Sequence, residues 1–187
     1  MKLPGTCIDM PSNDKDVAKT TLDSIFLGGG LVLSQIGNLT GLELYIIQNW
    51  VKRGFLSPPV RKQYSRRQFC RIVIINMLRD TLPLDTVLKL LSYINGSLND
   101  ESDDLIDDSE LYSRYVNLHL SISLREVSKE ALEKAIDEAV EGYCEPCEGA
   151  CERLRVVLRV MAYAHISGYW KRKAEDSLEM IGQESAQ

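Results

Sequence analysis

Apolar residues recur at helical spacing along most of the chain, and this pattern predicts a mainly α-helical protein. We expect helices at about residues 13–27, 33–39, 42–53, 66–79, 83–95, 110–119, 128–141 and 150–178. The Gly28-Gly29-Gly30 triplet after the first of these is interpreted as a helix C-cap and hinge. A phosphate-binding P-loop is excluded because no Gly-Lys-Ser/Thr follows the triplet.

The helices expected at 33–39 and 42–53 form a pair joined by a tight turn at Thr40-Gly41. Gly37 is small where the second helix of the pair would cross the first closely. One side of the second helix carries an apolar stripe at Leu42, Ile46 and Trp50, which we expect to face the core. The opposite side is polar and also follows helical spacing, with Tyr45, Gln48, Asn49 and Lys52.

The segment after this pair predicts a small β wing. Phe55-Leu56-Ser57-Pro58-Pro59 cannot be helical, because proline lacks an amide proton and restricts the residue before it. Residues 60–64 then predict a short strand. Two short helices, a glycine-containing turn and a basic wing are the parts of a winged helix-turn-helix, whose second helix enters the DNA major groove.

Charge is segregated along the chain. The net charge is −5, which taken alone argues against nucleic-acid binding. Positions 52–79, however, hold eight basic residues and no acidic ones, and positions 100–110 hold seven acidic residues and no basic ones. The basic stretch fits a local phosphate-binding patch. We interpret the acidic stretch as a solvated linker, because it lacks the alternating ligands and glycine of a calcium-binding loop.

These patterns predict two groups of DNA contacts. Gln48 and Asn49 each offer a donor and an acceptor, the pairing that reads adenine, and Tyr45 shares their face. Basic residues at the end of the second helix and around the wing would bind phosphates. This second group consists of Lys52, Arg53, Arg61, Lys62, Arg66 and Arg67.

The same segments resemble a known family. Residues 33–42 (LSQIGNLTGL) and 48–58 (QNWVKRGFLSP), with Tyr64-Ser65 and Leu82-Pro83-Leu84-Asp85, resemble the winged-helix pattern of MerR-type regulators. A narrower resemblance, in residues 48–54 (QNWVKRG), 74–78 (IINML) and 88–96 (LKLLSYING), is to the bacterial domain-of-unknown-function family 1836. The resemblance covers about residues 31–120 and implies a dimeric regulator with no known ligand.

The chain departs from the MerR pattern at two places. Gln48-Asn49-Trp50 stands where that pattern has Arg-Tyr-Tyr, and the wing lacks the usual Gly-Tyr-Arg. These departures, together with the net acidity, leave an alternative open. In it, the chain is a protein-interaction module that kept a degenerate winged-helix fold without DNA binding.

Cys144, Cys147 and Cys151 are spaced as Cys-x2-Cys-x3-Cys, and Pro146 and Gly149 favour a loop there. Thiolates at this spacing are compatible with zinc or another thiophilic metal, or with an iron–sulfur cluster, although a fourth ligand is not evident. Three bystander thiols and a reversible thiol switch are the other interpretations. His119 and His165 stand isolated in the sequence, and no catalytic set at a familiar spacing is present. We therefore expect no enzyme and no obligatory cofactor.

The predicted organisation has four parts. They are an N-terminal helix and hinge (1–30), a winged helix-turn-helix (31–96), an acidic linker (97–109) and a helical dimerisation or sensing region (110–187). No signal peptide or membrane-spanning stretch is evident, so a cytoplasmic protein is expected. The predicted function is sequence-specific transcription regulation by a homodimer on double-stranded DNA, with a thiol- or metal-responsive regulator as a further alternative.

Overall fold

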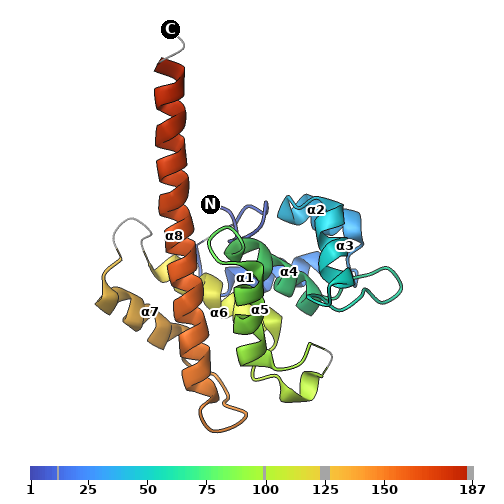
Figure 1. The fold of residues 1–187 in the computed structure, drawn as a ribbon. Helices are drawn as coiled ribbons and strands as arrows, with labels where there is room; N and C mark the ends of the chain where they lie inside the picture. Colours follow the sequence, from blue (N-terminus) through green and yellow to red (C-terminus); the bar gives the residue numbers. More distant parts are fainter. Residues whose placement is uncertain (12, 99, 123–126, 185–187) are drawn as a thin grey trace.

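The computed structural model describes residues 1–187 except 12, 99, 123–126 and 185–187 (Figure 1). The described residues form eight α-helices and one 3-10 helix, which confirms the mainly helical class. The elements are α1 (Val17–Ile25), α2 (Leu33–Thr40), α3 (Leu44–Lys52), α4 (Arg66–Leu78), α5 (Leu84–Asn95), η1 (Glu101–Asp103), α6 (Asp108–Ser121), α7 (Lys129–Val140) and α8 (Ala150–Glu184).

Local side-chain chemistry sets several of the helix starts. Ser65 begins α4 with a capping box: its hydroxyl accepts from the Gln68 amide at 3.2 Å, and the Gln68 side chain accepts from the Ser65 amide at 2.9 Å. Ser128 begins α7 as predicted, because its hydroxyl accepts from the Ala131 amide at 3.1 Å. The start of α6 is two residues earlier than predicted.

Helix α4 lies at the centre of the molecule, and nine of its residues are buried. It packs against α2, α5, α6 and α8, while α6 packs in turn against α1, α7 and α8. One hydrophobic core runs through all of these contacts and includes residues from every one of the eight α-helices. The helix pair predicted to bind DNA is therefore fixed on the same core as the C-terminal helices.

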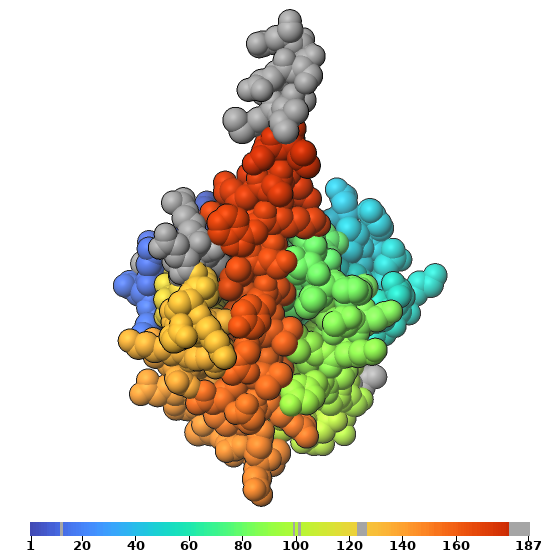
Figure 2. All heavy atoms as spheres, turned by 60° about the vertical axis from the view of Figure 1, so that its left-hand side comes forward, coloured from blue at the N-terminus to red at the C-terminus, as the bar shows by residue number. Residues whose placement is uncertain are grey.

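Helix α8 crosses the body between α5 and α7, and its C-terminal part projects beyond them (Figures 1 and 2). Leu154, Val157, Leu158 and Met161 are fully buried, which confirms that the apolar stretch at 154–170 is largely a core helix. Tyr163 and Trp170 remain about half exposed, at 50% and 52%. None of the described helices is long and apolar enough to cross a membrane.

The expected β wing is not formed as a strand pair in the described residues. The segment between α3 and α4 makes isolated bridges instead, between Val60 and Gln63 and between Leu31 and Tyr64. Residues 60–64 are too few to extend a ladder, and Tyr64 pairs with Leu31, two residues before α2, rather than with another part of the wing. The segment is a short bridged loop at the edge of the helix pair.

The acidic stretch is solvated only in part: Asp100, Asp103, Asp107 and Glu110 are exposed, as expected of a linker, but two other carboxylates are not. The Asp108 side chain is 1% exposed and that of Asp104 is 8% exposed. Arg67 and Arg71 of α4 pair with these carboxylates. The sequence argument considered the run of like charges by itself, whereas the fold brings Arg67 and Arg71 of α4 against Asp104 and Asp108 and buries these two carboxylates.

Candidate nucleic-acid interface

Helices α2 and α3 form a compact pair with a turn of three residues, 41–43. Gly41 has a φ of 72°, a left-handed conformation that glycine adopts readily, and its amide donates to the Gly37 carbonyl at 2.8 Å. A Cβ on Gly37 would lie 2.6 Å from Leu44 Cδ2 and 3.1 Å from the Leu42 carbonyl oxygen. The close crossing predicted at Gly37 is thus confirmed, and both glycines are required by the geometry of the pair.

The two sides of α3 differ as the hydrophobic pattern predicted, except that Ile46 of the expected core stripe is only half-buried and Ile47 beside it is buried instead. Ile47 and Trp50 are buried, with exposed fractions of 0% and 4%, and fix the inner side of the helix to the core. Four polar or aromatic residues are exposed on the outer side: Tyr45, Gln48, Asn49 and Lys52. The predicted base-reading residues therefore share one accessible face of a firmly anchored helix.

The loop after α3 presents two basic residues beside this face. Val60 and Gln63 exchange backbone hydrogen bonds of 3.0 and 2.9 Å around Arg61 and Lys62. These two have positive φ values of 50° and 65°, the conformation of a type I′ hairpin turn, which residues other than glycine and asparagine adopt at a cost. Both side chains are exposed. The backbone thus holds two cations at the tip of the loop in a strained conformation.

The six predicted phosphate-binding residues fall into two groups. Lys52, Arg53, Arg61 and Lys62 are exposed, and within the described part of the chain none of them is in an ion pair. Arg66 instead pairs with Asp23 of α1, and Arg67 pairs with Asp104 and lies 3.9 Å from Asp108. The charges of Arg66 and Arg67 are therefore compensated inside the molecule.

A buried polar cluster contacts the start of the loop between α3 and α4. Arg71 donates to the carbonyl of Phe55, just after α3, and to Asp108 Oδ2, each at 3.3 Å. Asn95, at the end of α5, donates to Asp108 Oδ1 at 3.0 Å. Burial raises the pKa of Asp108, and the Arg71 and Arg67 guanidiniums act in the opposite direction. The cluster ties α4, α5 and α6 to the start of the loop.

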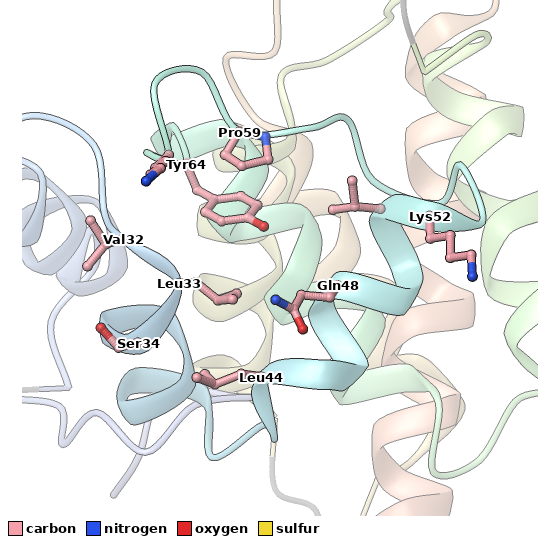
Figure 3. A pocket seen from close by; sticks show the side chains of 10 residues that line it. Val32, Leu33, Ser34, Leu44, Gln48, Lys52, Pro59 and Tyr64 are labelled. Atoms are coloured by element: carbon pink, nitrogen blue, oxygen red, sulfur yellow. The ribbon is translucent and has the colours of Figure 1, made fainter.

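A groove of about 760 Å³ lies between α2, α3 and the loop (Figure 3). Its wall is mostly apolar and is formed by Val32, Leu33, Leu44, Val51, Pro59 and Tyr64. The polar lining residues are Ser34, Gln48, Lys52 and Lys62. The sequence analysis did not predict this groove, because its wall is assembled from residues at the edges of three separate segments.

Residues 31–115 match the model of a family described as a domain of unknown function, DUF1836. This span starts just before α2 and ends within α6, so it includes the helix pair, the loop and the Asp108 cluster. The chain is also 30% identical over 84 residues to the uncharacterized protein YkrK of Bacillus subtilis (strain 168). That match covers 43% of this chain and 36% of the relative, so the chain spans only about a third of YkrK. No solved structure matches.

The three C-terminal cysteines are not gathered into a metal site. Cys144 and Cys147 are exposed in the loop that leads into α8, and Cys151, in the first turn of α8, is partly exposed. Among the described residues, no group of three or more His, Cys, Asp or Glu side chains is placed to hold a metal ion. Glu145 accepts a hydrogen bond from the Cys151 amide at 3.1 Å, so this carboxylate caps the start of α8.

The two histidines, which stand isolated in the sequence, lie together in the structure. His119 of α6 and His165 of α8 stack with ring centroids 4.6 Å apart, and the Tyr115 hydroxyl lies 2.6 Å from His165 Nδ1. Burial lowers the pKa of His119 to about 4 and that of His165 to about 3. Their contact depends on the packing of α6 on α8, which sequence spacing does not reveal.

Proposed function

We propose that the chain is a sequence-specific DNA-binding regulator of transcription that acts as a dimer. In this proposal α3 enters the major groove, as in MerR-like winged helix-turn-helix proteins, and the loop tip at Arg61 and Lys62 serves as the wing. Gln48 and Asn49 read base edges, with Tyr45 beside them.

One observation carries the proposal: α3 is anchored by Ile47 and Trp50 while its opposite face is exposed and polar. A recognition helix needs both properties, because its inner side must dock on the protein while its outer side must hydrogen-bond to bases. The exposed cations beside that face, Lys52, Arg53, Arg61 and Lys62, provide the phosphate contacts. Arg66 and Arg67 contribute less, since carboxylates already pair with them.

The test is selection of bound fragments from genomic DNA at ~150 mM salt, where weak phosphate contacts are largely suppressed. The wild-type protein is compared with Gln48→Ala/Asn49→Ala and with the matched control Lys89→Ala/Ser92→Ala, whose sites are exposed on α5. We expect the wild type and the control to enrich one motif with two-fold symmetry, and the α3 variant to lose it.

Salt dependence provides a second criterion. A dimer that makes about six phosphate contacts should show a log–log slope of affinity against salt near −5. Absence of any duplex affinity at ~50 mM salt would overturn the proposal, because even non-specific phosphate binding is strong there. The interaction module, which the net charge of −5 favours, would then be the better description.

A further inference from the structure

The groove beside α3 has a feature that DNA binding does not explain. Six of its ten lining residues are apolar or aromatic, and Val32 and Leu44 leave 39% and 40% of their surfaces exposed. DNA backbone contacts need donors and cations rather than an apolar wall. A mostly apolar concavity of 300–1,000 Å³ with a few polar groups is instead typical of a small-molecule site, and this groove has about 760 Å³.

The charge of the groove restricts its ligand. Lys52 and Lys62 line it, and the lining contains no carboxylate. Figure 3 shows the Tyr64 hydroxyl and the Gln48 amide directed toward the space between α2, α3 and the loop. Burial raises the pKa of Tyr64, so its phenol remains a hydrogen-bond donor at neutral pH. Figure 3 also shows the Lys52 side chain extending away from these two groups, so Lys62 is the cation that, with these donors, suits one negatively charged head group.

The loop backbone supports this interpretation independently. Lys62 has a φ of 65° and follows Arg61 at 50°, a pair of strained residues that places the Lys62 side chain along the groove. Strain of this kind clusters at ligand-binding segments.

We propose that this groove binds a small amphipathic carboxylate, whose apolar tail lies along Leu33, Leu44 and Val51 and whose head group pairs with Lys62. Bound there, the ligand occupies Gln48, so it competes with DNA for the face of α3. The proposed ligand site is argued from the groove alone, whereas the competition between ligand and DNA rests on the proposed function.

The binding test uses decanoate as the probe, below its micelle-forming concentration, with decanol and decyltrimethylammonium as neutral and cationic comparisons. Titrations are followed by amide NMR and calorimetry. We expect one saturable site for decanoate, with shifts at Val51, Lys62 and Tyr64. Decanol should bind roughly tenfold more weakly and the cation not measurably, since one lost charge-assisted contact corresponds to about that factor.

Three variants locate the site. Ser34→Trp fills the groove and should abolish decanoate binding; Lys62→Gln should weaken decanoate about tenfold and leave decanol unchanged. Lys89→Gln, an exposed lysine on α5, is the matched control and should bind like the wild type. No saturable decanoate binding by the wild type, or binding that survives Ser34→Trp, overturns the proposal.

Competition is measured on the DNA motif selected above. Decanoate should release bound DNA from the wild type and not from Ser34→Trp if that variant keeps its DNA affinity. Saturable decanoate binding without any DNA affinity would refute the proposed function but keep the site. DNA binding without a decanoate site would refute this inference but keep the proposed function.

Discussion

Replacing Asp108 by Asn tests how strongly the buried charge cluster stabilises the fold. The substitution preserves the shape of the side chain but removes the charge that faces Arg71, which is 7% exposed, at 3.3 Å. It also removes a carboxylate 3.9 Å from Arg67, which keeps its pairing with Asp104. Breaking a buried ion pair from one side costs about 3–5 kcal/mol, because the remaining charge stays buried without compensation. That loss is a large fraction of the 5–15 kcal/mol typical of a whole domain.

The assay is urea unfolding followed by the fluorescence of Trp50, which is buried on α3, and by far-UV circular dichroism. Asp107→Asn is the matched control, because that residue is exposed and asparagine preserves its cap on the Ser109 amide. We expect a change of less than about 0.5 kcal/mol for the control.

A double variant distinguishes the loss of the ion pair from the cost of leaving the Arg71 charge buried without a partner. Arg71→Met/Asp108→Leu removes both charges and should recover part of the stability that Asp108→Asn loses. A loss below about 1 kcal/mol for Asp108→Asn, equal to that of the control, would refute the reasoning that this pair fastens α4 to α6.

Two further changes probe other parts of the molecule. Gly37→Val should destabilise the protein by about 1–3 kcal/mol, because its Cβ would meet Leu44 and the Leu42 carbonyl; an unchanged urea midpoint would show that α2 and α3 can separate at little cost. Acidification should also destabilise it. The folded-state pKa values of His119 and His165, about 4 and about 3, lie below the unfolded value of ~6.5, so stability present above pH ~6.5 is lost as pH falls. Between pH 7.5 and 5 the loss should reach about 2 kcal/mol for each imidazole, and His119→Phe should reduce it; a flat pH profile would contradict the burial of the pair.

The local hydrophobic pattern was sufficient to predict most of the helices and the two faces of α3. Helical periodicity separated Trp50 from Gln48 and Asn49, and the small size of Gly37 indicated a close crossing that the structure contains. The cap at Ser128 was equally local, because it depends only on the first turn of α7. Such features need no knowledge of which distant segments meet.

Features that depend on long-range contacts were not predictable in the same way. Asp108 is buried only because α6 packs on α4, and His119 meets His165 only because α6 packs on α8. The groove requires residues from α2, α3 and the loop together. The strand expected at residues 60–64 is replaced by a bridged turn, since Tyr64 is paired with Leu31.

The N-terminal segment and α6 make hydrogen bonds to the part of the chain that carries the helix pair, and these bonds limit which segments can be moved into another protein. The Asn76 side chain donates to the carbonyls of Gly5 and Thr40 at 2.9 and 3.2 Å, and the Tyr112 hydroxyl donates to the Pro4 carbonyl at 2.8 Å. A chimera that transferred only residues 31–96 would leave Asn76 without the Gly5 carbonyl and Arg71 without Asp108. A unit that is to fold in another protein must therefore extend from residue 1 through α6, so the exposed face of α3 is better altered by substituting its residues than by exchanging modules.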